Sequence, residues 1–302
     1  MHRGRRARHS VPRTRGGRIF VAALLGGAIL GCAPSPVSLS QSQSHLERNL
    51  PAMRPDGGYD YNTLFVDGHK ANLDRVLSSM VALESIAEFE TLDGHISPTR
   101  DRATGIVIFQ RFILTVDHAV TSYELTASVP NGTVVVPAKK LRQETRIVLN
   151  GQKHRLHALL RDRDNDIALF RLPGKLRLPS FPYGIGNSND LKIGNFIYVV
   201  GNPMNMGLNV REGIVSNLRA PEIIHALSAV PANTFMVSNG LNPGDSGAPA
   251  LAIRDGEFEL VGLTQGTFLM GQRLGWVLRI NAIMDKIGPY IESARLAGHP
   301  AP

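Results

Sequence analysis

Short apolar runs recur along the chain from about residue 80 to residue 280, and polar or Gly/Pro-rich turns separate them. Their length and their β-branched and aromatic residues are typical of β-strands. Strands are expected at residues 80–89, 105–109, 112–116, 133–136, 146–149, 157–160, 167–172, 196–200, 213–218, 235–238, 248–253, 259–263 and 275–280. Asn150-Gly151 and Asp255-Gly256 each lie between two such runs, which predicts two β-hairpins.

Two other segments have helical spacing. Residues 72–79 begin with Asn72, a favourable N-cap, and residues 281–296 carry an apolar face that Gly288-Pro289 is expected to break or kink. Between residues 173 and 187, three prolines and three glycines divide the strands into two groups. The pattern predicts an all-β fold of barrels or a sandwich, with a crossing near residues 173–187 and a C-terminal helix.

The N-terminal segment differs from the rest of the chain. Seven arginines and no acidic residue precede an apolar run at residues 19–30, and Gly31-Cys32 follows it. A run of roughly 12 residues is short for a transmembrane helix and typical of a signal peptide. The sequence ILGC at residues 29–32 resembles the lipobox of bacterial lipoproteins, in which the chain is cut before the cysteine and the cysteine is lipidated. The alternative is a plain secretory signal with an incidental cysteine.

This pattern divides the chain into three predicted parts. Residues 1–31 are a lipoprotein-type signal peptide, with Cys32 as the lipidation site. Residues 32–57 are rich in Ser, Gln and Pro and form a flexible tether. Residues 58–298 are the folded domain.

The net charge of +8 comes from the targeting segment, because the remaining Lys and Arg residues nearly balance the 25 Asp and Glu residues. We therefore expect no nucleic-acid partner. Cys32 is the only cysteine, so the domain forms no intrachain disulfide. His154 and His157 have no evident third ligand, and we expect neither a metal ion nor a cofactor.

Three side chains are candidates for chemistry. Ser246 lies in a Gly/Pro-rich turn at residues 242–249, which suits either an exposed nucleophile or an ordinary hairpin turn. His118 follows the strand predicted at 112–116, and Asp166 directly precedes the strand predicted at 167–172. Asp117 is interpreted as a turn or surface acid, because its side chain points away from that of its neighbour His118.

The same segments resemble three motifs of trypsin-like serine peptidases, in the family's order. The histidine motif is similar to ILTVDHAV at residues 113–120, the aspartate motif to NDIAL at 165–169, and the serine motif to GDSG at 244–247. The sequences GNP at 201–203, EGIVS at 212–216 and LNPG at 241–244 are similar to the bacterial HtrA/Deg-type branch. The resemblance covers roughly residues 80–291.

This resemblance implies two six-stranded antiparallel β-barrels of the chymotrypsin type, at about residues 80–172 and 188–280, with a C-terminal helix. It implies Ser246 as nucleophile, His118 as general base and Asp166 as the residue that orients His118. The backbone N–H groups of Gly244 and Ser246 would form an oxyanion hole.

The resemblance also implies a substrate-binding region. Thr264 and Gly266 match the strand along which the substrate backbone pairs, and Gly240 matches the floor of the specificity pocket. Because Gly240 carries no charge, a small or apolar residue is expected before the cleaved bond.

Three features depart from the HtrA pattern, and one of them is a polar insertion at residues 93–102, before the histidine strand. That branch usually has Asn before the serine, whereas this chain has Asp245, as the trypsin branch has. In the trypsin branch this Asp pairs with a new N-terminus freed by activation cleavage. No activation site is evident here, so Asp245 is expected to bond locally. HtrA proteins usually carry PDZ domains, and no room for one is expected after Ser246.

The sequence thus predicts a serine endopeptidase of the bacterial cell envelope, acting on proteins or peptides and anchored in the membrane through lipidated Cys32. It would face the periplasm or the exterior, with the outer membrane favoured because Ala33, not Asp, follows the cysteine. The alternative is a catalytically silent trypsin-like fold that serves as a lipid-anchored peptide- or partner-binding module.

Overall fold

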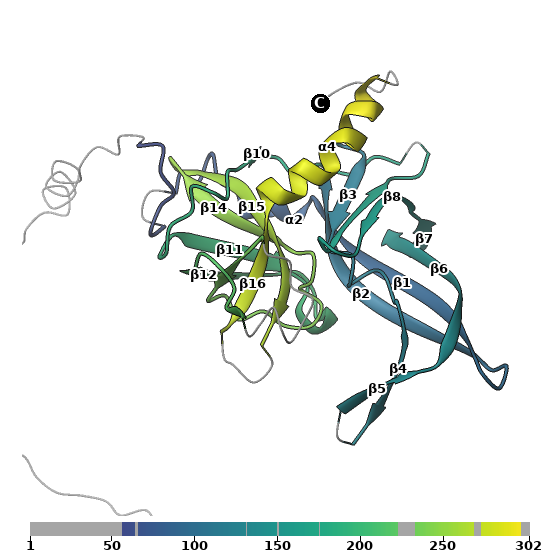
Figure 1. The fold of residues 1–302 in the computed structure, drawn as a ribbon. Coiled ribbons are helices and arrows are strands. Elements are labelled where there is room, and N and C mark those ends of the chain that lie inside the picture. The colour runs from purple at the N-terminus through teal and green to yellow at the C-terminus, as the bar shows by residue number, and fades with distance from the viewer. Residues whose placement is uncertain are drawn as a thin grey trace, which may run out of the picture. The chain divides into compact units, whose positions relative to one another are not determined.

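The fold is known from a computed structural model, which describes residues 56–63, 66–130, 132–149, 151–174, 176–222, 233–268 and 273–296. The predicted signal peptide, Cys32 and nearly all of the predicted tether lie outside the described residues. All described elements belong to one compact unit, Met53–Pro302. Strands dominate these elements (Figure 1), which confirms the predicted all-β class. No described helix is long and apolar enough to cross a membrane.

The first sheet has seven strands in the order β7-β6-β1-β2-β3-β9-β8. Strands β4 and β5 lie between β3 and β6 in the sequence but pair only with each other, as a separate two-stranded sheet. The elements of this half are α2 (Leu73–Leu77), β1 (Met80–Thr91), β2 (Ile96–Ile108), β3 (Phe112–Thr115), β4 (Leu125–Val129), β5 (Gly132–Val136), β6 (Ala138–Leu149), β7 (Gln152–Arg155), β8 (His157–Asp162) and β9 (Ile167–Arg171).

The second sheet has the order β10-β15-β14-β11-β12-β13-β16, and an additional ladder joins β15 to β16. That ladder closes β11 to β16 into a six-stranded antiparallel barrel (Figure 1). The elements of this half are β10 (Gly184–Ile185), β11 (Phe196–Gly201), the 3-10 helix η1 (Pro203–Asn205), β12 (Asn209–Asn217), β13 (Thr234–Val237), β14 (Pro249–Arg254), β15 (Glu257–Thr267), β16 (Gly275–Arg279) and α4 (Ile280–Leu296).

The first sheet differs in detail from the six-stranded barrel that the sequence implied. It has seven strands and, within the described ranges, no ladder joins β7 to β8, so it is a curled half-barrel. Strands β6 and β8 border the opening with polar side chains. Arg161 of β8 donates to the Thr145 hydroxyl of β6 at 3.0 Å and to the Val120 carbonyl at 3.1 Å. At this opening, side-chain hydrogen bonds take the place of the backbone ladder that would close a barrel.

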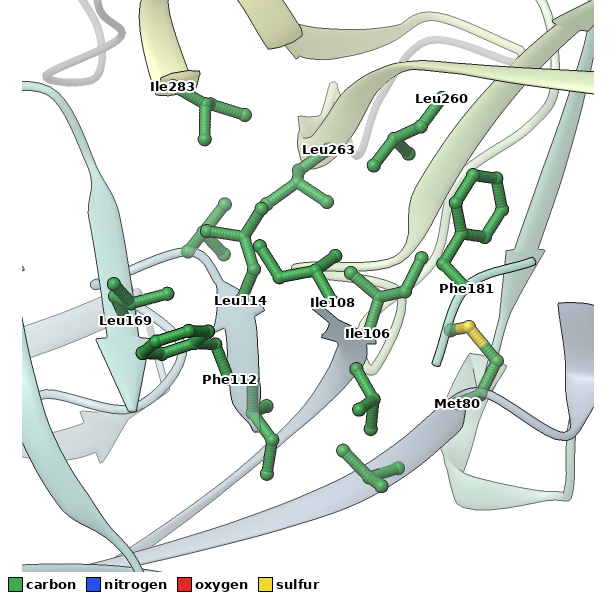
Figure 2. Close-up of a cluster of buried hydrophobic side chains, with 14 of the residues drawn as sticks. Met80, Ile106, Ile108, Phe112, Leu114, Leu169, Phe181, Leu260, Leu263 and Ile283 are labelled. Carbon is green, nitrogen blue, oxygen red and sulfur yellow. The ribbon is translucent and has the colours of Figure 1, made fainter. Parts of the chain in front are cut away.

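Buried apolar side chains form one core that joins the two sheets and another inside the closed barrel. The first includes Leu114 of β3, Leu263 of β15 and Ile283 of α4, and Figure 2 shows these side chains lying together. The second includes Ile197 and Phe235, which are fully buried. The joining core fixes the ends of strands from both sheets against each other, and these strand ends carry the candidate site.

Several local predictions are confirmed. The Asn72 side chain caps α2 by accepting from the Asp74 N–H at 2.8 Å. Asp255 and Gly256 join β14 to β15 with φ of 51° and 84°, the left-handed values that a two-residue type I′ turn requires. The polar stretch at residues 93–102 contributes the start of β2, which pairs with β1. The break expected at Gly288-Pro289 is wrong, because helix α4 continues through Pro289.

Candidate active site

His118 lies in a tight turn just after β3. All four residues of β3 are buried, so the end of the strand is held by packing. The Val120 N–H donates to the Asp117 carbonyl at 3.0 Å and closes the turn around His118. The imidazole projects from this turn with 48% of the side chain exposed. A rigid strand therefore presents a histidine that other molecules can reach.

Asp166 lies in the turn between β8 and β9, directly before the buried residues of β9. Its φ is +55°, a left-handed value that Asn and Asp adopt more easily than most residues. Asp162 supports the turn by accepting from the Asn165 N–H at 3.0 Å. Asp166 itself is 4% exposed. This backbone turns the carboxylate inward, toward His118.

The structure brings His118, Asp166 and Ser246 together. Asp166 Oδ2 lies 2.7 Å from His118 Nδ1, and Asp166 Oδ1 accepts from the His118 backbone N–H at 2.8 Å. On the other side of the ring, His118 Nε2 lies 3.1 Å from Ser246 Oγ. Burial alone would lower the pKa of His118, but the hydrogen bond and the charge of Asp166 outweigh it and raise the pKa above its ordinary value.

The turn that carries Ser246 depends on two glycines. Gly244 and Gly247 have φ of +96° and +83°, values that strain other residues. A Cβ on Gly244 would lie 2.5 Å from the Asn202 carbonyl oxygen, and one on Gly247 would meet the Thr115 side chain. Among the described residues, the N–H groups of Gly244 and Ser246 donate no hydrogen bond. The turn therefore leaves two free backbone donors beside the Ser246 hydroxyl.

Thr104 of β2 ties this turn to the first sheet, a role that the sequence did not reveal. Its hydroxyl donates to the Gly244 carbonyl at 2.9 Å, and its N–H donates to the Ser246 carbonyl at 3.0 Å. Thr104 is fully buried. The serine turn is thus hydrogen-bonded to the same sheet that carries His118 and Asp166.

The two neighbouring acids, Asp117 and Asp245, are both buried. The interpretation of Asp117 as a surface acid is wrong: it has no exposed surface, and it accepts from the Thr121 hydroxyl at 2.7 Å and from Tyr123. Asp245 accepts locally from the Asn242 N–H at 2.8 Å, as expected. Its other oxygen lies 2.7 Å from the guanidinium of Arg211 on β12. The sequence offered no signal for that pairing.

The predicted substrate residues lie in different environments. Gly240 has φ of +64° in the turn after β13. Thr264 is buried, and its hydroxyl donates to the Ala248 carbonyl at 3.2 Å and to that of Asp245. Gln265, which was not singled out, has its carbonyl 3.4 Å from Ser246 Oγ. Gly266 pairs with Trp276 of β16. On β15, the residue that contacts the Ser246 hydroxyl is therefore Gln265, one residue beyond Thr264.

No group of three or more His, Cys, Asp or Glu side chains in the described ranges is arranged to hold a metal ion.

Comparison with known proteins places the chain in a family. A family model described as a trypsin-like peptidase domain matches residues 103–263, more than half of the chain. The chain therefore belongs to the trypsin-like peptidase domain family. The matched segment contains His118 and Asp166 and the Ser246 turn.

Individual relatives are similar over part of their length. The chain is 31% identical over 109 residues to protease Do-like 1, chloroplastic, of Arabidopsis thaliana, covering 35% of this chain and 24% of that one. It is 29% identical over 136 residues to a probable periplasmic serine endoprotease DegP-like of Buchnera aphidicola subsp. Baizongia pistaciae, covering 45% and 27%. The chain thus spans about a quarter of the length of these relatives.

A solved structure shares the fold. A variant of the HtrA-type protease AlgW with a decapeptide superimposes with a TM-score of 0.55 at 15% identity, covering 73% of this chain and 65% of that chain. At this identity the likeness concerns the fold.

Proposed function

We propose that this chain is a serine endopeptidase of the HtrA type that hydrolyses peptide bonds through an acyl-enzyme. The observation that carries the proposal is the continuous set of contacts from Asp166 to His118 to Ser246, at 2.7 and 3.1 Å. These distances lie within the range expected for an activated nucleophile, its base and the residue that orients the base.

The geometry assigns a step to each side chain. His118 Nε2 takes the hydroxyl proton while Ser246 Oγ attacks the peptide carbonyl carbon. Asp166 accepts from His118 Nδ1–H, which fixes the tautomer and stabilises the imidazolium. The imidazolium then gives its proton to the leaving amine as the C–N bond breaks. Water, deprotonated by His118, attacks the acyl-enzyme and releases the carboxylic acid and free Ser246.

The free N–H groups of Gly244 and Ser246 form the oxyanion hole in this proposal. Preorganised donors of this kind stabilise the negative oxygen of the tetrahedral intermediate, and removing one typically costs about 3–4 kcal/mol. The left-handed φ of Gly244 orients the first donor. Its steric contact with Asn202 leaves no space for a larger residue.

The edge of β15 beside Ser246 is the proposed binding strand for the substrate. The ladder between β14 and β15 ends at Pro249 and Leu263, so residues 265–267 have no β14 partner on that side. An extended peptide would add to this edge through backbone hydrogen bonds. Gln265 and Gly266 lie on this edge, and Thr264 fixes it through hydrogen bonds from its hydroxyl to the carbonyls of Asp245 and Ala248. Uncharged Gly240 lies in the proposed pocket for a small or apolar residue.

We also propose that the enzyme works in the bacterial cell envelope, anchored through lipidated Cys32 and the tether at residues 32–57. The signal-like N-terminus supports this, and the Buchnera relative is named as a periplasmic endoprotease. Cys32→Ala should move the full-length protein out of the membrane fraction. Unchanged fractionation would argue against the lipid anchor.

A fluorophosphonate probe, which reacts with activated serines, tests the catalytic proposal on the full-length protein. We expect covalent labelling that is lost in Ser246→Ala and strongly reduced in His118→Ala. Mapping the bonds cleaved in an unfolded protein would then define specificity. If the wild-type protein is neither labelled nor cleaves unfolded protein, the alternative of a silent peptide-binding module is correct.

A further inference from the structure

The acid that precedes Ser246 is buried against strands β11 and β12. Asp245 is 1% exposed, and its Oδ1 lies 2.7 Å from a guanidinium nitrogen of Arg211. Its Oδ2 accepts from the Asn242 N–H at 2.8 Å. The Asp245 side chain therefore links β12 to the start of the turn that contains Gly244 and Ser246.

The described residues around Asp245 and Arg211 leave space for the carboxylate and offer the guanidinium no other partner. A Cβ on Gly201, at the end of β11, would collide with the Asp245 carboxylate. The guanidinium nitrogens of Arg211 are buried and make no hydrogen bond among the described residues, so the ion pair with Asp245 is what balances this cation. A buried carboxylate without a cation is strongly unfavourable, and the turn would have to move to expose it to water.

We propose that Arg211 is a positioning residue. Through Asp245, it holds the turn at residues 242–247 in the shape in which the N–H groups of Gly244 and Ser246 form the proposed oxyanion hole. This inference rests on the proposed peptidase function. The resemblance to the trypsin branch implied that a new N-terminus supplies the cation for this aspartate, whereas here a side chain of β12 already supplies it. The turn is therefore formed without activation cleavage, and it stays formed at alkaline pH because a guanidinium keeps its proton.

Chemical rescue of Arg211→Ala tests the role of the charge. In the full-length protein, kcat/KM should fall about a hundred- to a thousandfold, the effect of losing an oxyanion donor. Guanidinium ion at non-denaturing concentration should restore part of the rate, and urea, a neutral molecule of similar shape, should not. Arg219→Ala, which removes an exposed arginine near β12, is the matched control and should keep the wild-type rate.

Two outcomes would overturn the proposal. One is a wild-type rate in Arg211→Ala, and the other is equal rescue by urea, which would mean that Arg211 only fills space. A wild-type protein that does not react with fluorophosphonate would instead refute the peptidase function itself, so the two failures are distinguishable.

Arg211→Lys provides a second test if the alanine variant does not fold. Lysine keeps a positive charge at neutral pH but loses it in alkaline solution, with an ordinary pKa of about 10.4. The variant should therefore show a fall in kcat/KM at alkaline pH that the wild-type protein lacks. Identical alkaline profiles for the two proteins would contradict the proposal, since a purely structural arginine would not affect this limb.

Discussion

The closed barrel surrounds an apolar interior, whereas the first sheet, apolar where it meets the barrel, has polar side chains at its opening. Ile197 and Phe235 inside the barrel have no exposed surface. The opening of the first sheet holds a pocket of about 510 Å³ whose lining includes Gln143, Thr145 and Arg161. Both sheets contribute to one site, but they hold their side chains in place by different interactions.

In the first sheet, polar side chains converge on one carbonyl next to the proposed base. The Val120 carbonyl accepts from the Ser85 hydroxyl at 2.7 Å, from Arg161 at 3.1 Å and from the Gln143 side-chain amide. Val120 is two residues beyond His118. Polar side chains at the opening of this sheet therefore anchor the loop that carries the proposed base, His118.

In the closed barrel, the serine turn is held by backbone geometry and an ion pair, together with hydrogen bonds from the hydroxyls of Thr104 and Thr264. Gly244 and Gly247 allow the chain to pass close to its neighbours, and Asp245 pairs with Arg211. Close packing around the two glycines therefore fixes the backbone of this turn. The comparison predicts that substitutions in the two halves will affect different properties.

The largest effect is expected from Asp166→Asn. Asparagine tolerates the left-handed φ, so the turn should keep its shape while the charge that orients and supports His118 is lost. We expect kcat to fall about 10⁴-fold, as in the serine-protease precedent, with little change in melting temperature. Asp162→Asn in the same turn is the control, because Asp162 bonds Asn165 and not His118. Equal losses in both variants would contradict the assignment.

Gly244→Ala tests the backbone of the serine turn. Its Cβ would meet the Asn202 carbonyl, and we expect a loss of about 10²–10³ in kcat from a displaced oxyanion donor. Gly207→Ala is a matched control, since Gly207 has a similar φ of +109° but open space around it. Steady-state rates would separate the two. If both variants lose the same activity, backbone strain, and not the steric contact, explains the effect.

The fold class and the three residues that meet in the candidate site were predictable from local patterns. Strands such as β3 and β9 are continuous apolar runs, and His118, Asp166 and Ser246 each adjoin such a run within a recognisable motif. The Asp255-Gly256 hairpin was predictable for the same reason, since its turn type requires those residues.

Features that depend on contacts between distant segments were not predictable. Arg211 lies far from Asp245 in sequence, and nothing local distinguishes it from a solvated arginine. Asp117 is adjacent to exposed-looking residues, yet Thr121 and Tyr123 bury it. The open edge of the first sheet depends on side chains of β6 and β8 that only the fold brings together.

The pH dependence of the rate sharpens the role of the first sheet. Asp166 raises the pKa of His118, and the base must be neutral, so kcat/KM should rise with pH through a value above the ordinary 6.5 or so. The protonated ring stabilises the fold below the unfolded pKa, and this contribution is lost as pH rises through the folded pKa. In a pH–rate profile of Asp166→Asn, the rise of kcat/KM on the acid side should move to lower pH. If it does not move, Asp166 does not raise the pKa of His118.

The smallest effects are expected from one polar and one apolar substitution that should destabilise the fold to a similar extent. Gln143→Met removes a donor to Val120, and Ile197→Val removes a methylene from the barrel core. Each should lower the free energy of unfolding by about 1 kcal/mol, measured by denaturant titration. Only Gln143→Met should also lower kcat/KM, about fivefold if the same energy is lost in positioning His118. If Ile197→Val lowers the rate equally, stability rather than the polar network limits the activity, and the two halves hold the site in the same way.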